Sequence, residues 1–507
     1  MYDTNYLANR LRASSVGHDD SLFAELIDGR KISYGEMFGI AEKNAMALIS
    51  AGLKPGDCVA TQVEKSIESI QLYLGTVLAG GIFLPLNTAY TPSEMAYFLG
   101  DAKPKILVCD PDKSSSLQPL SDDAGVAVLL TLAADGSGTL IDALPDHNDN
   151  FKAVPRSKDD LASFLYTSGT TGRSKGAMLS HENLSSNAET LKEYWYFSQS
   201  DILIHALPIF HIHGLFVAIN ITLCAGSSML FLPNFDKEQI LQQMKKATVL
   251  MGVPTFYVRL LESPNLSQEA TAHMRLFVSG SAPLLAETHK RWSEVTGTAI
   301  LERYGMTETN MNASNPYDGE RRAGTVGLAL PGVEVRIADP DTGKELAQGE
   351  IGSVEICGPN VFKGYWQMPE KTKEEFREDS FFITGDMGMK DKDNYLSIVG
   401  RSKDLIISGG YNVYPKEVEI VLDDIDGVFE SAVIGVPHPD FGEGVLAVVV
   451  LETGKNLVEN DLKIVIKRML ASYKQPKKIF FVDELPRNTM GKVLKNNLRE
   501  AHKNHFL

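Results

Sequence analysis

A glycine-rich loop that directly follows an apolar run restricts most strongly how this chain can fold. The apolar run, residues 161–165, predicts a buried strand, and the segment after it, residues 166–176, is YTSGTTGRSKG. Glycines let the backbone turn and bring its N–H groups close to oxygen atoms, while the hydroxyls and Lys175 add further donors. The pattern therefore predicts a strand that ends in a phosphate-binding loop.

Two named motifs and an ordinary flexible turn compete for this segment. The nucleotide motif G-x-x-x-x-G-K-[ST] does not fit, because Lys175 is followed by Gly176 and the glycine spacing differs. Residues 172–176 do fit G-x-S-x-G, the turn that carries the nucleophile of esterases, with Ser174 as the serine. A serine esterase therefore stays open as an alternative at this point.

Composition narrows the class of protein. With 507 residues, 43% apolar and 22% charged, the chain is ordinary globular material with more than one domain. The first residues do not resemble a signal peptide, and no apolar run approaches the roughly 18 residues that span a bilayer. A net charge of −16 argues against nucleic-acid binding, so an anionic substrate would need a local basic site.

The four cysteines favour a reducing environment. Cys58, Cys109, Cys224 and Cys357 are scattered without a C-x-x-C pair, which argues against a zinc site and a disulfide framework. We therefore expect a cytoplasmic protein that acts on small molecules, without membrane or nucleic-acid partners.

Alternating helix-like and strand-like segments predict an α/β fold. Helices are expected at residues 34–51 and 66–78, and strands at 58–62, 82–86 and 105–109, which favours a largely parallel sheet. From Gly332 the pattern changes to short strands with Asp/Gly turns, at residues 333–338, 352–357 and 395–399. We predict a β-rich subdomain over about residues 325–400.

A run of small and charged residues, 400–404, marks the expected domain boundary. We predict a large α/β domain of mixed parallel sheets flanked by helices over residues 1–402. A small, mobile α+β domain over residues 403–507 follows it, with a hinge at Lys403.

Polar residues near the predicted strand ends suggest binding groups. Thr307 and Glu308 follow a strand expected at residues 299–303 and suit Mg²⁺ held mainly through phosphates, although a solvated pair is the alternative. Asp386 is expected after a tight turn, as a partner for ribose hydroxyls or as simple turn chemistry. His205, His211 and His213 lack acidic or cysteine neighbours at ligand spacing, so pocket histidines are favoured over a metal site.

Taken together, these segments resemble the adenylate-forming superfamily of acyl- and aryl-CoA synthetases, peptide-synthetase adenylation domains and luciferases. The resemblance covers nearly the whole chain and rests on YTSGTTGRSKG, SGSAPL, YGMTE, ITGD, GRSKDLIISGGYNVYPKEVE and PRNTMGK, which occur in that order. The segments LERYGMTETNMNASNPYDG, HALPIFHIHG and GVPTFYVRLL are similar to those of bacterial malonyl-CoA synthetases.

The resemblance implies a two-step ligase that uses ATP, Mg²⁺ and coenzyme A. A carboxylate attacks the α-phosphorus of ATP, which gives an acyl adenylate and pyrophosphate. The small domain then rotates at Lys403, and the thiol of coenzyme A takes the acyl group. The carboxylate is itself the nucleophile, so positioning and charge neutralisation suffice, which weakens the esterase alternative.

The resemblance also implies roles for individual residues. The phosphates would be held by Thr167, Ser168, Gly169, Thr170, Thr171, Gly172 and Lys175. The remaining ATP-binding residues would be Gly280, Ser281, Ala282, Glu302, Arg303, Tyr304, Gly305, Met306, Thr307, Asp386, Arg401 and Lys492. Thr307, Glu308, His211 and Lys492 would serve catalysis, with Glu308 on the metal, and Ser408, Gly409 and Gly410 would face coenzyme A.

The arginine at position 303 favours a substrate acid with two carboxylates. Relatives that handle neutral acyl groups commonly have a small residue before Tyr-Gly, and an arginine there suits a second carboxylate. Breaking a buried charge pair costs roughly 3–5 kcal/mol, or two to four powers of ten. His213, expected on the same strand face as His211, and Arg259 are further candidates. Pairing of Arg303 with Glu302 or another acid is the alternative, although neighbours on a strand point oppositely.

Malonate is the predicted substrate. The sequence does not rank malonate against methylmalonate, because one methyl group changes the binding free energy by only about 1–3 kcal/mol. A short-chain monocarboxylate ligase and a carrier-protein-loading enzyme stay open. Acetylation of Lys492 by an acetyltransferase would remove its charge and act as an off-switch. We expect a monomer or a homodimer.

Overall fold

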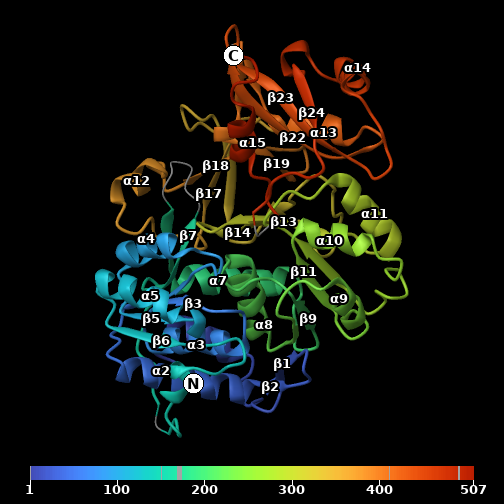
Figure 1. Ribbon diagram of the computed structural model, residues 1–507. Coiled ribbons are helices and arrows are strands. Elements are labelled where there is room, and N and C mark those ends of the chain that lie inside the picture. The colour runs from blue at the N-terminus through green and yellow to red at the C-terminus, as the bar shows by residue number, and fades with distance from the viewer. Residues whose placement is uncertain (1, 150, 168–173, 410, 489–490) are drawn as a thin grey trace.

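The computed structural model describes residues 2–149, 151–167, 174–409, 411–488 and 491–507. Within these ranges the chain forms four β-sheets with surrounding helices (Figure 1). In Figure 1 the blue and green elements of the first half lie in the lower part of the molecule, and the orange and red end of the chain lies at the top. Among the residues described, no helix has the length and apolar character needed to cross a bilayer.

The first sheet has six strands in the order β6-β5-β3-β4-β7-β8, of which only the β7–β8 pair is antiparallel. These strands are β3 Cys58–Gln62, β4 Ile82–Pro85, β5 Ile106–Cys109, β6 Val128–Thr131, β7 Leu161–Thr167 and β8 Lys175–Ser180. The helices that connect them are α2 Tyr34–Ser50, α3 Ile67–Leu78, α4 Pro92–Ala102, α5 Pro111–Ala124 and α6 Thr139–Asp142.

Capping side chains fix where these helices begin. Ser66 precedes α3 and accepts a hydrogen bond from the backbone of Ser69, while Thr91 precedes α4 and forms the reciprocal pair with Glu94. Pro92 then occupies the first turn of α4, where its missing N–H costs nothing. These caps set the ends of the loops that rise from the sheet toward the phosphate loop.

The second sheet has nine strands in the order β15-β14-β13-β12-β11-β9-β10-β1-β2. Its strands are β1 Leu22–Leu26, β2 Lys31–Ser33, β9 Ile202–His205, β10 Ser228–Phe231, β11 Val249–Gly252, β12 Leu276–Ser279, β13 Leu301–Met306, β14 Asn310–Ser314 and β15 Leu328–Ala329. Its helical segments are α1 Tyr6–Ala13, α7 His181–Tyr194, the π-helix η1 His213–Ile219, α8 Asn220–Ala225, α9 Lys237–Gln243, α10 Pro254–Leu261 and α11 Ala286–Thr296.

The central strands of the second sheet run parallel, from β1 through β10, β9, β11 and β12 to β13. Ligands of open α/β sheets bind at the carboxyl ends of parallel strands. The ends of β9, β11, β12 and β13 are followed by the histidine segment, Pro254, Gly280 and Thr307, respectively. The sequence-predicted acyl and nucleotide residues therefore gather along one edge.

The third sheet is antiparallel and has the order β16-β17-β18-β19. Its elements are β16 Glu334–Ala338, β17 Gly352–Cys357, β18 Phe382–Lys390 and β19 Leu396–Arg401, with α12 Pro369–Glu374 between β17 and β18. The predicted β-rich segment is thus present in the structure.

The last sheet has the order β21-β20-β23-β22, with β24 beside β23. Its elements are β20 Ile406–Ser408, β21 Tyr411–Val413, α13 Pro415–Asp423, β22 Val428–His438, β23 Gly442–Leu451, α14 Glu459–Met469, β24 Lys478–Phe481 and α15 Lys495–His502, with 3-10 turns at η2 Ser402–Asp404 and η3 Ser472–Lys474. Two apolar clusters built only from residues after 405 pack on this sheet, so it has a core of its own.

The predicted fold class, a large α/β part followed by a small α+β part, is confirmed. Two local predictions about the second sheet and its connections were wrong. The strand expected at residues 299–303 is β13, which continues through Met306 because β14 pairs with it as a hairpin. His211 and His213 do not lie on a strand: His211 is in a turn, and His213 begins the π-helix η1.

Candidate functional site

The two ends of the phosphate loop are held side by side. Thr167 ends β7 and pairs with Lys175, the first residue of β8. The Tyr97 hydroxyl of α4 donates to the carbonyl of Ser174 at 2.7 Å, so α4 fixes the exit of the loop. Ser168, Gly169, Thr170, Thr171 and Gly172, which were predicted to bind phosphates, lie outside the described residues.

Lys175 is buried and has an anionic partner. Its side chain is 8% exposed, and its ammonium lies 2.9 Å from Oε1 of Glu375. The same ammonium lies 4.1 Å from the centre of the Tyr365 ring. Sequence reasoning missed both Glu375 and Tyr365, because a glutamate at the end of a charged helix is normally solvated and nothing local points it toward a residue 200 positions earlier.

Glu308 lies in the turn between β13 and β14, as a carboxylate only 5% exposed. Oε1 lies 3.1 Å from the hydroxyl of Tyr365, and burial raises the pKa of the Glu308 carboxyl. No basic side chain within the described ranges forms an ion pair with it. A buried carboxylate without a cation fits a divalent metal that is held mainly by phosphates, whereas no cluster of three or more metal-ligating side chains occurs in those ranges.

Arg303 lies on β13 with only 3% of its surface exposed. Its Nε and Nη2 atoms are buried without a hydrogen-bond partner, and the described parts of the chain contain no ion pair to it. The alternative pairing with Glu302 is therefore not formed. Burial lowers the pKa of Arg303 to about 9, so the guanidinium still carries its charge at pH 7.

The backbone of Gly280 makes room for the Arg303 guanidinium. A Cβ atom at Gly280 would lie 2.4 Å from Cζ of Arg303, closer than real Cβ contacts, so a side chain there would displace the guanidinium. The next residue, Ser281, has a left-handed φ of 72°. Its hydroxyl lies 3.2 Å from Nδ1 of His213, which brings the turn after β12 onto the first residue of η1.

The histidines differ in their surroundings. His213 is buried, and burial together with the nearby charge of Arg303 lowers its pKa well below the usual value, so it is neutral beside that cation. His211 is also neutral at pH 7, since burial lowers its pKa to about 4, and its Nε2 has no partner. His205 hydrogen-bonds the carbonyl of Gly214 at 2.9 Å and belongs to the packing under this segment.

Asp386 was predicted to follow a tight turn, and this is wrong: it lies inside β18. Across the sheet Ile383 pairs with Glu355 and Met387 pairs with Ser353, so residues 384–386 face Val354 alone. Gly385, with φ of 70°, allows this bulge. Because the bulge changes the direction of the side chains, Asp386 points to the nucleotide residues.

Two side chains converge on this aspartate. Nε of Arg401 lies 2.7 Å from Oδ1 of Asp386, and the Tyr304 hydroxyl donates to Oδ2 at 2.6 Å. The predicted nucleotide residues Tyr304, Asp386 and Arg401 are thus brought together.

Glu302 is buried nearby, with Oε1 accepting from the backbone N–H of Leu284 at 3.1 Å and Oε2 unpartnered. Its burial raises the pKa of the Glu302 carboxyl to about 8. At neutral pH this residue is therefore a neutral acid that can donate as well as accept a hydrogen bond.

Lys492 reaches the same region from the end of the chain. The residue is exposed, but protein atoms surround the ammonium, and this desolvation together with the charge of Arg401 lowers its pKa to about 8 despite the opposing effect of Asp386. The preceding residue, Gly491, lies so close to Thr255 that an added Cβ would come within 3.2 Å of the threonine hydroxyl. The loop with Lys492 thus contacts the start of α10.

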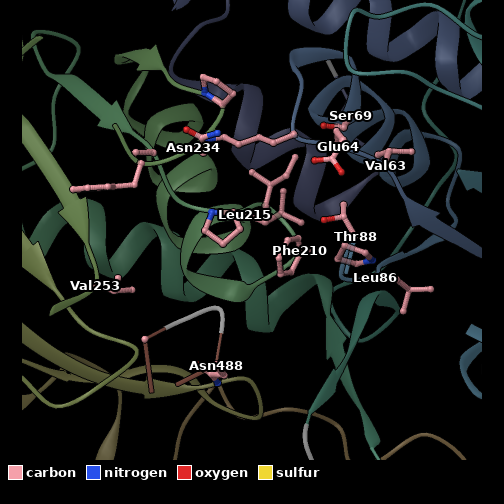
Figure 2. A pocket seen from close by; sticks show the side chains of 18 of the residues that line it. Val63, Glu64, Ser69, Leu86, Thr88, Phe210, Leu215, Asn234, Val253 and Asn488 are labelled. Atoms are coloured by element: carbon pink, nitrogen blue, oxygen red, sulfur yellow. The ribbon is translucent and has the colours of Figure 1, made fainter. Parts of the chain in front are cut away.

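A cavity of about 410 Å³ opens next to this loop. Figure 2 shows its lining, which includes Phe210, Leu215, Val253 and Asn488. Arg259, on α10, also lines it; its side chain is exposed and lies 5.7 Å from the Phe235 ring. Neither Arg303 nor His213 lines this cavity, so it is separate from the Arg303 cluster.

The residues predicted to face coenzyme A lie in the last sheet. Ser408 ends β20 and is buried, and Gly409 follows with a φ of 60°. Gly410 lies outside the described residues. Lys403, the predicted hinge, is exposed in the turn η2 that follows β19.

Comparison with known proteins gives a consistent picture. The family model described as AMP-binding enzyme matches residues 12–366, and the one described as AMP-binding enzyme C-terminal domain matches residues 417–492. A malonate–CoA ligase from Arabidopsis thaliana is 34% identical, and the alignment covers 94% of this chain and 86% of that protein.

Two solved structures of one bacterial protein superpose on the whole chain. ATP-bound MatB from Rhodopseudomonas palustris is 58% identical, covers 99% of this chain and 100% of its own, and gives a TM-score of 0.97. Apo MatB from the same organism has the same identity and coverage, and a TM-score of 0.87. The chain thus has the overall arrangement of the nucleotide-bound structure more than that of the nucleotide-free one.

Proposed function

Because this chain belongs to the AMP-binding enzyme family, we propose that it joins malonate to coenzyme A, with ATP converted to AMP and pyrophosphate. The observation that carries the choice of substrate is Arg303, a buried guanidinium without a protein partner beside predicted nucleotide residues. Leaving such a charge unpaired costs free energy that a ligand with a carboxylate removes. The malonate–CoA ligase among its relatives supports the same choice.

In the first step, one carboxylate oxygen of malonate attacks the α-phosphorus of ATP. The bond from that phosphorus to the bridging oxygen breaks, and pyrophosphate leaves with the electron pair. Lys175 and the loop before it bind the phosphates, while Lys492 neutralises charge at the reacting oxygens. Asp386, Arg401 and Tyr304 hold the ribose end. The other carboxylate of malonate pairs with Arg303, with the neutral His213 as a further contact, whereas Arg259 is exposed at the separate cavity and contributes at most through water.

Mg²⁺ fits this site through Glu308. The carboxylate is buried with a single hydroxyl beside it, and Thr307 precedes it on the same turn. A bound Mg²⁺ would offset phosphate charge there. The chain itself would supply one carboxylate, from Glu308, and one hydroxyl, from Thr307.

In the second step, the thiol of coenzyme A loses its proton to solvent and attacks the carbonyl carbon of malonyl-AMP. A C–S bond forms, the C–O bond to the α-phosphate breaks, and AMP leaves with the electron pair. The cavity beside Phe210 is a route for the pantetheine arm, and the neutral His211 is the next residue after Phe210 in the chain. We assign residues 1–402 and 403–507 to two domains, with rotation at Lys403 that brings Ser408 and Gly409 to the arm. The separate core of the last sheet supports that division.

Adenylation and thioester formation can be tested separately for Lys492. Lys492→Ala should impair adenylate formation far more than thioester formation from supplied malonyl-AMP, since the first step alone builds charge at the α-phosphate. Equal loss in both steps would remove Lys492 from this role. An acetyl group on Lys492 should act in the same way, which makes a lysine acetyltransferase a possible regulatory partner.

The experiment that tests the function is ATP–pyrophosphate exchange with acetate, propionate, malonate, methylmalonate and succinate, followed by product formation with coenzyme A. Malonate should support the fastest exchange, with methylmalonate second, and thioester should appear only with coenzyme A. A monocarboxylate ligase would prefer propionate, a carrier-protein loader would not need coenzyme A, and an esterase would not need ATP. We place the enzyme in the cytoplasm, because its four cysteines are all unpaired. We expect it to be a monomer or a homodimer.

A further inference from the structure

Glu375 forms an ion pair with Lys175, the lysine that was predicted to bind the phosphates of the nucleotide. It directly follows α12, and Oε1 accepts from the Lys175 ammonium at 2.9 Å and from Lys371 at 3.2 Å. The side chains of Lys175 and Glu375 are 8% and 21% exposed, so solvent screens this pair only in part.

The hydroxyl of Tyr365 completes the surroundings of Glu375. It lies 2.7 Å from Oε2 of Glu375 and 3.1 Å from Oε1 of Glu308. A hydroxyl has one proton, so the shorter contact is the one to which it donates. Burial acts to raise the pKa of Glu375, but the hydrogen bonds from Tyr365 and Lys175 outweigh it and hold the pKa below its usual value. Glu375 is therefore a fully partnered carboxylate.

Backbone pairing keeps these side chains in register. The N–H of Trp366 donates to the carbonyl of Gly176 at 2.7 Å, and the N–H of Met178 donates to Gly364 at 2.9 Å. The segment with Tyr365 thus forms an antiparallel bridge to β8 at Ala177, two residues after Lys175. The ion pair is held by the same ladder that forms the exit of the phosphate loop.

We propose that Glu375 is a built-in competitor of the nucleotide for Lys175. Without nucleotide the carboxylate neutralises the buried ammonium. When ATP binds, its phosphates interact with the Lys175 ammonium while the Glu375 carboxylate repels them. This repulsion weakens the binding of both ATP and the product pyrophosphate. As pyrophosphate leaves, Glu375 takes its place, so Lys175 is not left as an unpaired buried cation. This inference rests on the proposed function of the site.

The test measures Mg·ATP and pyrophosphate affinity by titration calorimetry in Glu375→Gln. Loss of the competing charge should tighten both about three- to tenfold, and pyrophosphate should become a correspondingly stronger product inhibitor. Glu374→Gln is the matched control, since it removes the same charge from the neighbouring residue, which is 67% exposed and pairs with Lys371. It should change affinity less than twofold.

A double-mutant cycle separates competition from simple support of the fold. With Lys175→Met as background, Glu375→Gln should no longer tighten ATP binding, because the contested ammonium is gone. If Glu375→Gln is poorly folded, Glu375→Asp, which withdraws the carboxylate by one methylene, should tighten binding to a smaller extent.

Weaker or unchanged ATP binding in folded Glu375→Gln would overturn the inference, as would equal tightening in Glu374→Gln. Failure of the unmodified protein to bind ATP would instead overturn the proposed function on which the inference rests.

Discussion

Two buried cations of this protein, Arg303 and Lys175, have opposite surroundings. Arg303 has two nitrogen atoms without a hydrogen-bond partner, whereas Lys175 is paired with Glu375 and covered by the Tyr365 ring. The difference corresponds to the ligands that we propose for them. A small acid brings one extra charge, so selectivity requires a guanidinium that only this acid can neutralise. A nucleotide makes many contacts, so its binding does not require an unpaired cation, and the lysine can be partnered by Glu375. The same partner eases the release of pyrophosphate.

Removal of the unpaired cation should have the largest effect. Arg303→Ala should lower malonate-dependent ATP–pyrophosphate exchange by at least about a hundredfold, because it removes the partner of the second carboxylate. ATP binding, measured by calorimetry, should stay within about threefold, since we assign Arg303 to the acid and Lys175 to the phosphates.

Arg291→Ala is the control for this substitution, because Arg291 is an exposed arginine of α11. It should leave exchange unchanged. If Arg303→Ala keeps the malonate activity of the original protein, the contrast between the two cations has no bearing on substrate choice.

A substitution next to Arg303 should displace it without removing its charge. A Cβ at Gly280 would overlap the guanidinium of Arg303 and push it from its observed position. Gly280→Ala should therefore reduce malonate-dependent exchange about tenfold or more.

Gly100→Ala, on α4, is the matched control, since an added Cβ there meets open space. Exchange should be lost in Gly280→Ala alone. Full activity in that variant would show that the observed position of Arg303 is not required.

A third cation, Lys492, is neither fully buried nor paired, and its charge should be sensitive to pH. Its pKa is about 8, so the ammonium is charged below pH 8 and loses its proton as the pH rises above that value. The kcat/KM for ATP in the adenylation step should therefore fall above pH 8, by up to about tenfold per pH unit. Lys492→Arg should be slower but lack this alkaline decline, and an identical profile in that variant would assign the decline to another group.

The smallest effect is expected at Arg259. This side chain is exposed and lines the other cavity, so water screens its interaction with the acid. Arg259→Ala should raise the KM for malonate about two- to fivefold, measured by exchange at varied malonate. A loss as large as that of Arg303→Ala would mean that burial does not distinguish the two arginines.

Local sequence patterns predicted the elements of the fold well. The helix expected at residues 66–78 is α3, which begins after the capping side chain of Ser66, and the strand expected at residues 58–62 is β3. The phosphate-loop flanks, Glu308 and Arg303 were found from residue type and resemblance, and the structure places Arg303 without a protein partner.

The parts that sequence reasoning missed depend on contacts between distant segments. Glu375 meets Lys175 across 200 residues, and nothing in the composition of α12 indicates that partner. The turn expected before Asp386 is a bulge, which exists only relative to the neighbouring strand β17. His213 was expected on a strand because its neighbours are apolar, yet its ring faces Ser281 from the start of a π-helix. Strand register and helix docking decide these positions, and local patterns do not encode either.

The central claim is that a buried, unpartnered guanidinium makes the acyl site select an acid with two carboxylates. The most direct test is ATP–pyrophosphate exchange by the unmodified protein with malonate and with propionate at equal concentrations. We predict exchange at least about a hundredfold faster with malonate. Equal rates with the two acids would contradict the claim.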